Sequence, residues 1–445
     1  MEASQRMDRE RHEQAPSIAP ILAVNFVGTL GFSIVLPFLV YLVTRLGGNA
    51  LVYGVMGATY SFFQLVGASI LGRWSDRYGR RRILLLSQLG TALSWGLFLV
   101  ALMLPVTSLV RVESHALGAF TLTVPLIVLF AARALDGITG GNASVANAYL
   151  ADVTTEEDRA ANFGRLAISG NLGFVVGPAL AGLLGATAWA EMAPATAAFL
   201  ISVVGCVMIL VGVPESHPCA RERIPARSGT QRVLGQEPKD CFRGTEGRKT
   251  SLAEIARMPV VPRLLVLNLL VFLAFNVFYV VFPMYVVRAM HWTLAQTGTF
   301  FAVLSLLMVV AQGPILKRAA MRWSERVLVI GGSVLLAVSF LFFRASRWEW
   351  LYVGAVLLAL GNGLMWPSFQ SLLSRAAGPR LQGTVQGLAG SGAAIASIAG
   401  LLIGGVLFGS LGADVFNLPA MVSLLVCILG MGIGNELAPA EGERQ

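Results

Sequence analysis

Residues 125–150 read PLIVLFAARALDGITGGNASVANAYL, an apolar run that is long enough to cross a lipid bilayer. Arg133 and Asp136 place two opposite charges inside it. A charge at the bilayer centre costs at least about 2.5–3.5 kcal/mol on insertion scales, so such residues are expected to face protein or water and to have a function. Their spacing of three lets them pair on one helix face. We interpret them as a proton- or cation-responsive site in a central cavity, with an ion pair that serves packing alone as the alternative.

The composition is that of a membrane protein. Of the 445 residues, 56% are apolar and 13% are charged, whereas soluble domains carry about 25% charged residues. The apolar runs are continuous and about twenty residues long, which predicts transmembrane helices rather than a barrel of alternating strands. The twelve predicted spans are 18–42, 51–72, 82–105, 120–150, 163–187, 191–213, 262–286, 296–316, 327–344, 349–373, 383–409 and 414–435.

The spans fall into two pseudo-symmetric sets of six. We predict an N-terminal tail (1–17), a first six-helix bundle (18–213), a polar, basic linker (214–261), a second bundle (262–435) and a C-terminal tail (436–445). At an offset of 223 residues, glycines of the fifth span fall on glycines of the eleventh; the pairs are Gly164 with Gly387, Gly177 with Gly400 and Gly182 with Gly405. Such internal repeats are typical of transporters.

The net charge of +9 is sorted by loop and does not indicate a nucleic-acid partner. With the N-terminus inside, only Arg45, Arg111, Arg288, Arg344 and Arg347 fall outside, and Arg133 lies in the membrane. By the positive-inside rule, this predicts a multi-pass protein of the plasma (inner) membrane with both termini cytoplasmic. The four cysteines have no metal-ligand spacing, so we predict no metal and no cofactor.

The loop 72–82, GRWSDRYGRRR, holds five arginines and one aspartate. A topology anchor needs the arginines, but it does not need two glycines and an aspartate at fixed spacing. The loop resembles the signature loop of the major facilitator superfamily, whose motif positions would be Gly72, Asp76, Gly79, Arg80 and Arg81.

The resemblance implies a cytoplasmic gate. Asp76 would meet the positive N-terminal end of a helix in the other half, expected to be 383–409, and Arg80 would pair with Asp152. These contacts would hold only while the cytoplasmic side is closed. The corresponding second loop, 314–327, keeps basic residues but lacks the glycines and the aspartate, so we expect the gate chemistry to be concentrated in the first half.

The fourth and fifth spans resemble those of twelve-span drug:proton antiporters, the tetracycline-exporter-like branch especially. Arg133 and Gly137 are similar to a motif associated with proton coupling, and the stretch 148–164 is similar to that branch. The antiporter-type motif would consist of Gly164, Gly173, Gly177, Pro178 and Gly182, for which a simple small-residue packing face is the alternative. Many members carry an acid in the first span, which this chain lacks, so we expect Asp136 to have taken over proton handling.

Polar and aromatic side chains inside the spans are the candidates for a substrate cavity. They are Asn25, Phe32, Asn171, Phe272, Asn276, Tyr279, Gln312, Asn362, Trp366 and Gln370. Singly, each fits packing or lipid contact as well as ligand contact. As a group they predict an apolar, aromatic-lined cavity suited to hydrophobic compounds.

Together these features predict a monomeric secondary transporter in the lipid bilayer. It would export hydrophobic or amphipathic, drug-like small molecules in exchange for protons by alternating access. The alternatives are a uniporter or symporter of a polar metabolite, and a sensor built on the same fold. An enzyme is not expected, because the sequence has no metal motif, phosphate loop or nucleophile–base arrangement.

Overall fold

The structure, a computed structural model, describes residues 18–114, 118–140, 142–154, 158–216, 252–258 and 260–432. Within these ranges, eleven helices are long and apolar enough to cross a bilayer. The last of them, Thr384–Met431, contains two spans, because the 3₁₀ turn η3 (Gly412–Phe416) divides it. The predicted all-α membrane fold with twelve spans is therefore confirmed.

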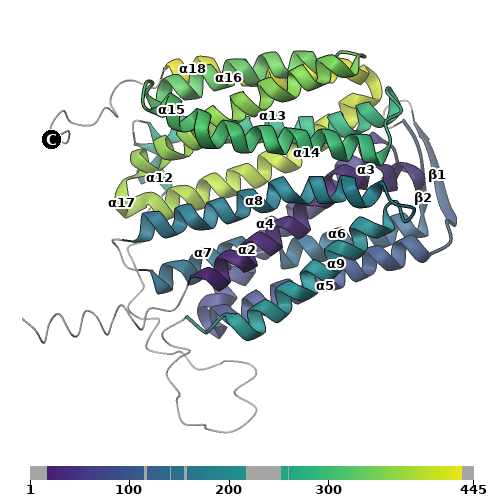
Figure 1. Cartoon of the computed structure of the whole chain (residues 1–445), viewed down its shortest axis with the longest axis horizontal. Coiled ribbons are helices and arrows are strands. Elements are labelled where there is room, and N and C mark those ends of the chain that lie inside the picture. The colour runs from purple at the N-terminus through teal and green to yellow at the C-terminus, as the bar shows by residue number, and fades with distance from the viewer. Residues whose placement is uncertain are drawn as a thin grey trace, which may run out of the picture.

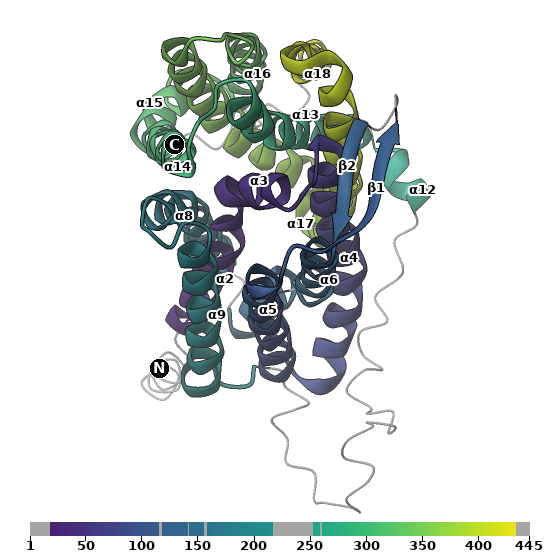
Figure 2. The same ribbon diagram turned by 90° about the vertical axis from the view of Figure 1, so that its right-hand side faces the viewer.

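The first six spans form one bundle, in the lower half of Figure 2. Its first span is interrupted at Ile34, because Pro37 has no N–H to offer to the carbonyl of Ser33 one turn earlier. The helices of this bundle are α2 (Ala19–Ser33), α3 (Val35–Arg45), α4 (Ala50–Tyr78), α5 (Arg80–Met103), α6 (Val124–Thr139), α7 (Asn142–Val153), α8 (Arg159–Gly185) and α9 (Met192–Gly212).

A β-hairpin precedes the fourth span. Its antiparallel strands are β1 (Ser108–Ser114) and β2 (Gly118–Thr123), with Arg111 opposite Thr121. The prediction that this span begins at residue 120 is wrong, since α6 begins at Val124. Residues 120–123 are apolar enough to extend a span, but the backbone N–H of Thr121 bonds the carbonyl of Gly47 at 2.9 Å, which fixes the segment as a strand over the end of α3.

The second bundle contains the remaining spans (Figure 1). Gly378, with φ of 64°, breaks the 64-residue α17 between the tenth and eleventh spans, since such a φ is tolerated by glycine. The elements are α12 (Leu252–Ala256), α13 (Val261–Arg288), α14 (Leu294–Val310), the π-turn η2 (Ala311–Ile315), α15 (Leu316–Ala320), α16 (Glu325–Phe342), α17 (Trp348–Leu411), η3 and α18 (Asn417–Met431).

The two bundles repeat the same hydrogen bond between helices. Asn25 Nδ2 donates to the carbonyl of Leu166 at 2.9 Å, and Asn268 Nδ2 donates to the carbonyl of Ala389 at 2.8 Å. Leu166 and Ala389 stand 223 residues apart, the offset found in the sequence. The first bond joins α2 to α8 and the second joins α13 to α17, so the weak sequence repeat is also a repeat of packing.

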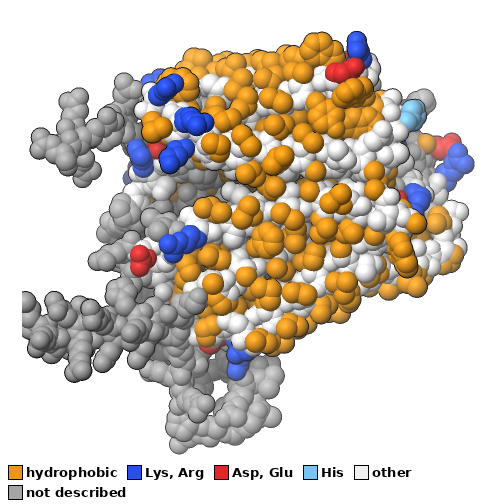
Figure 3. Space-filling model, in the orientation of Figure 1, with side chains coloured by type: hydrophobic (Ala, Val, Ile, Leu, Met, Phe, Trp, Pro, Cys, Tyr) orange, Lys and Arg blue, Asp and Glu red, His pale blue; other side chains and the backbone are white. Residues whose placement is uncertain are grey.

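The molecule has two ends, which we call the arginine end (loop 72–82) and the hairpin end (β1 and β2). Figure 3 shows a broad hydrophobic surface between the ends, with Lys and Arg side chains beyond it. The bundles meet near the hairpin end, where a Cβ added at Gly182 would lie 2.6 Å from Gly298 Cα. On the eleventh span towards the arginine end, a Cβ added at Gly387 or Gly390 would meet no atom within 4 Å.

Candidate functional site

The predicted charge pair is present and buried. Arg133 Nη1 lies 3.0 Å from Asp136 Oδ2, and the two side chains are 3% and 7% exposed. Gly137 brings their helix, α6, against α4, because a Cβ added there would lie 2.5 Å from the carbonyl oxygen of Tyr60. The structure thus shows an intrahelical ion pair inside a span, shielded by a neighbouring helix.

Tyr60 completes the surroundings of this pair, and sequence reasoning missed it. The Arg133 guanidinium carbon lies 4.3 Å from the centroid of the Tyr60 ring. The hydroxyl of Tyr60 accepts a hydrogen bond from Gln64 Nε2 at 2.9 Å. Nε of Arg133 is buried without a hydrogen-bond partner. No sequence signal would have shown Tyr60, because only the packing of α4 on α6 brings it close.

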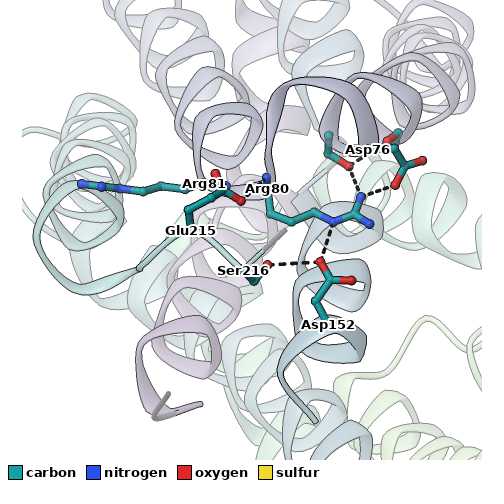
Figure 4. Close-up of polar contacts among 8 residues, drawn as sticks. Asp76, Arg80, Arg81, Asp152, Glu215 and Ser216 are labelled. Atoms are coloured by element: carbon teal, nitrogen blue, oxygen red, sulfur yellow. Dashed lines mark hydrogen bonds and ion pairs between the residues drawn. The ribbon is translucent and has the colours of Figure 1, made fainter. Parts of the chain in front are cut away.

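Arg80 is the centre of the gate motif (Figure 4). Its Nε lies 3.0 Å from Asp152 Oδ2, as predicted, and its Nη1 donates to Ser75 Oγ at 2.7 Å and also pairs with Asp76. Ser75 Oγ in turn donates to the carbonyl of Gly72 at 2.7 Å. The guanidinium therefore ties the end of α4 to the end of α7.

Glu215 belongs to the same cluster and was not predicted. Its carboxylate accepts the backbone N–H groups of Arg80 and Arg81 at 2.8 and 3.3 Å, and so caps the N-terminus of α5 (Figure 4). Gly79 has a φ of 100°, which favours glycine, and a Cβ there would lie 2.5 Å from Glu215 Oε2. The following residue, Ser216, donates to Asp152 Oδ2 at 3.2 Å. The signal was the stretch VPESHP at 213–218, which carries an acid directly after a span.

The expected dependence of the Arg80–Asp152 pair on the state of the gate remains a prediction. The pair lies within one bundle, and movement between bundles need not break it. Among the described side chains, Asp76 pairs with Arg80 and stays 54% exposed. Its contact with the eleventh span remains a prediction for the closed state.

The second half has an ion pair at the equivalent place, although the gate chemistry is expected to be concentrated in the first half. Glu325 at the start of α16 pairs with Arg375 on α17 at 3.2 Å, and Ser371 also donates to Glu325. Arg375 stands 223 residues after Asp152, so the two pairs are equivalent with their charges reversed. A comparison of residue types between the two halves does not reveal the pair, because the acid and the base have exchanged positions.

The antiporter-type motif sets how closely α8 approaches its neighbours. A Cβ added at Gly173 would lie 2.8 Å from the carbonyl oxygen of Phe26, and one at Gly177 would lie 2.9 Å from the backbone nitrogen of Ile34, both on the first span. Gly182 faces Gly298 of α14 in the other bundle. Pro178 is buried within α8. Gly164 has no atom within 4 Å of an added Cβ, so packing does not account for it.

Three of the cavity candidates have structural contacts. Asn25 also donates to Ser169 Oγ on α8 at 2.9 Å, and Asn276 donates to Ser397 Oγ on α17 at 2.9 Å, so both asparagines join helices of one bundle. Asn362 Nδ2 lies 3.9 Å from the sulfur of Met308, between α17 and α14. These contacts favour the packing role that the sequence had left open for such residues.

The aromatic candidates form two groups rather than one. Phe32 lies against Tyr60 in the first bundle, with ring centroids 4.9 Å apart. Phe272 lies against Trp366 in the second, at 5.4 Å, and Tyr279 lies 6.3 Å from the ring of Phe275. Of the polar candidates, Gln312 lies in the π-turn η2, Gln370 is half-buried on α17 and Asn171 is exposed on α8.

Comparison with known proteins agrees with this arrangement. The family model described as Major Facilitator Superfamily matches residues 21–320 and 264–442. The chain is 28% identical over 387 residues to the class C tetracycline resistance protein of Escherichia coli (86% of this chain, 87% of the relative). It is 27% identical over 381 residues to human solute carrier family 67 member A1 (85% and 82%).

Solved structures share the fold. The human organic anion transporter MFSD10 (TETRAN) aligns with a TM-score of 0.62 at 22% identity, covering 93% of this chain and 98% of the transporter. The peptide transporter POT in complex with sulfate aligns with a TM-score of 0.68 at 14% identity, covering 94% of each chain. Proteins of this fold are membrane transporters, which confirms the prediction of a transporter rather than an enzyme. The family match over both halves shows that the chain belongs to the Major Facilitator Superfamily.

Proposed function

We propose that this protein exports hydrophobic or amphipathic, drug-like small molecules across a plasma membrane in exchange for protons. The observation that carries the proposal is the Arg133–Asp136 pair, which is buried within a bilayer-crossing helix. Carboxylates in such places are typical of proton pathways. The tetracycline resistance proteins among the relatives support a drug-like substrate, and the close approach of α8 to α14 fits the antiporter-type motif.

Proton and substrate would act on the same buried arginine. With Asp136 ionised, the pair is neutral overall. When Asp136 takes up a proton, Arg133 is left as a buried cation without a counter-charge, which is costly in a low-dielectric interior. A conformation that admits water or substrate near Arg133 then becomes favourable. Protonation therefore biases the equilibrium between the two access states, as a coupling ion must.

The positive-inside rule puts the arginine end in the cytoplasm, with both termini. In that orientation the bundles are in contact at the end away from the cytoplasm, as loading of an exported compound requires. Closing the arginine end would bring Asp76 towards the eleventh span. The protein would work as a monomer, because each chain holds both bundles and all the residues of the site.

The test is proton movement in proteoliposomes under an imposed pH gradient. Tetracycline, a lipophilic cation, a neutral drug and a polar metabolite are added in turn to wild type, Asp136→Asn and the control Asp414→Asn. Asp414 is an exposed acid that pairs with Arg344, far from the site in sequence. We expect a drug-triggered proton flux that is lost only in Asp136→Asn. Flux retained in that variant refutes the role of Asp136, and drug transport without proton movement establishes a uniporter instead.

A further inference from the structure

The ion pair with Asp136 does not account for all the contacts that the buried Arg133 guanidinium needs. Among the described residues its acidic partner is Asp136, its Nε has no hydrogen-bond partner, and its side chain is 3% exposed. A buried cation that periodically loses its counter-ion needs another attractive group in contact with it. Among the described side chains, the ring of Tyr60 has the geometry to be that group.

The ring of Tyr60 lies where a cation is attracted. The guanidinium carbon is 4.3 Å from the ring centroid, within the distance of about 6 Å at which a cation interacts with the electron-rich face of an aromatic ring. Tyr60 is 7% exposed, so water does not screen the contact. The ring is available to Arg133 in both protonation states of Asp136, since it carries no titrating charge at neutral pH.

The ring is held in place from other sides. Gln64 Nε2 donates to its hydroxyl at 2.9 Å, and Gly137 lets α6 lie directly against the backbone at Tyr60. Phe32 on α2 packs against it, with centroids 4.9 Å apart, and Phe174 on α8 packs against Phe32 at 5.8 Å. A fixed ring can orient a flexible arginine side chain, because it loses little entropy in doing so.

We propose that Tyr60 is a positioning residue for Arg133: its ring holds the guanidinium beside Asp136, and it is the partner that remains when Asp136 is protonated. This rests on the proposed function in so far as Asp136 is protonated during transport. The contribution of the ring should be larger when Asp136 is neutral, because an ionised carboxylate already satisfies the cation.

Among the side chains that the structure describes, few other ionisable groups face this pair. The elements packed against α6 are the helices α4 and α5 and the strand β2. From α4, Tyr53 and Tyr60 are the titratable side chains that interact electrostatically with the pair. The α5 residues whose side chains bond α6 are Ser87, Thr91 and Ser94, which carry no charge; Thr91 bonds the carboxyl group of Asp136. A response to pH at this site therefore reports Asp136.

The first test is a set of double variants, read as melting temperature in detergent. Tyr60→Leu is made in wild type and in Asp136→Asn, which mimics the protonated acid. We expect Tyr60→Leu to lower the melting temperature more in Asp136→Asn than in wild type. Tyr60→Phe keeps the ring and should cause no such excess. Phe98→Leu, which removes a fully buried ring on α5, should cost the same in both backgrounds. Equal losses for Tyr60→Leu in both backgrounds overturn the proposal.

The second test is the pH profile of drug-triggered transport. Without the ring, protonating Asp136 leaves Arg133 with no partner, so the midpoint in Tyr60→Leu should move to lower pH by about one unit. Tyr60→Phe and Phe98→Leu should keep the wild-type midpoint. A shift in Tyr60→Phe as large as in Tyr60→Leu assigns the effect to the hydroxyl and overturns the proposal. If wild type moves no protons, the proposed function fails, while the melting experiment still decides the role of Tyr60.

Discussion

Gly182→Ala should shift the equilibrium between the two access states. Gly182 of α8 faces Gly298 of α14 in the other bundle, near the hairpin end. A methyl group there would lie 2.6 Å from Gly298 Cα. To reach an ordinary carbon–carbon contact, the two helices must separate by roughly 0.8 Å or more. Backbone atoms cannot rotate out of the way as a side chain can, so the two helices must move apart along their interface.

The added methyl group should destabilise only one of the two access states. Overpacking a close contact typically costs about 1–3 kcal/mol. In alternating access, this contact exists while the bundles touch at the hairpin end and is lost when that end opens. The cost then destabilises only the conformation seen here. The ratio of this conformation to the opposite one should fall by about 5- to 150-fold.

The assay is the distance between two spin labels at the arginine end. Arg165→Cys on α8 and Lys317→Cys on α15 are both exposed, and they sit on the two spans that meet at Gly182 and Gly298. The four native cysteines are replaced first. Pulsed electron paramagnetic resonance then gives the populations of the long and short distances. We expect Gly182→Ala to enrich the short distance, in which the arginine end is closed.

Two glycines of the same helix serve as controls. Gly164→Ala adds a methyl group that meets nothing within 4 Å, so the populations should not change. Gly177→Ala crowds Ile34 within one bundle, so it should lower thermal stability without changing the populations. The reasoning is refuted if Gly182→Ala behaves like Gly164→Ala, or if Gly177→Ala shifts the populations as much as Gly182→Ala does.

Three further predictions concern stability, read as melting curves in detergent. Glu215→Gln removes a negative charge from the N-terminus of α5 and should cost about 0.5–1 kcal/mol; no loss would argue against the cap. Charge reversal of Glu325 or of Arg375 alone should lower the free energy of unfolding by at most about 1 kcal/mol, since the two side chains are 24% and 57% exposed. Exchanging both residues should restore the stability, and failure to restore it would exclude a direct pair. Asn25→Leu and Asn268→Leu should each cost about 1–3 kcal/mol, with additive effects because they lie in different bundles; strong non-additivity would contradict their independence.

The spans could be predicted from the sequence because a bilayer imposes a length and a polarity on each of them. The limits of this signal appear at the fourth span, where β2 directly precedes α6. Hydropathy cannot separate an apolar strand from the first turn of a span when no turn residue stands between them. What decides is the hydrogen bond between Thr121 and Gly47, which joins residues far apart in the sequence.

In the candidate site too, contacts within one helix could be predicted from the sequence, whereas contacts between helices could not. Arg133 and Asp136 are three residues apart on one helix, so their pairing follows from helix geometry and was predicted. Tyr60 and Glu215 reach their partners only through tertiary packing. Nothing in the local sequence distinguishes Tyr60, and the acid after the sixth span does not by itself reveal which helix Glu215 caps. The resemblance to a family supplied the gate positions, yet it attached a state dependence to the Arg80–Asp152 pair that its place within a single bundle does not support.

The two halves repeat their packing but not their buried charges. The asparagine-to-carbonyl bond recurs at Asn25 and Asn268, and the gate pair recurs with reversed sign. Among the described residues, the buried charged side chains are Arg80, Arg133 and Asp136, all in the first bundle. If protons are taken up there, the second bundle responds only through the surface it shares with the first. At Gly182 and Gly298 that surface is backbone against backbone, which cannot deform gradually. A change of charge in the first bundle is therefore transmitted as movement of one whole bundle against the other. A single methyl group at this contact should shift the equilibrium between the two access states, the same equilibrium that a proton on Asp136 shifts.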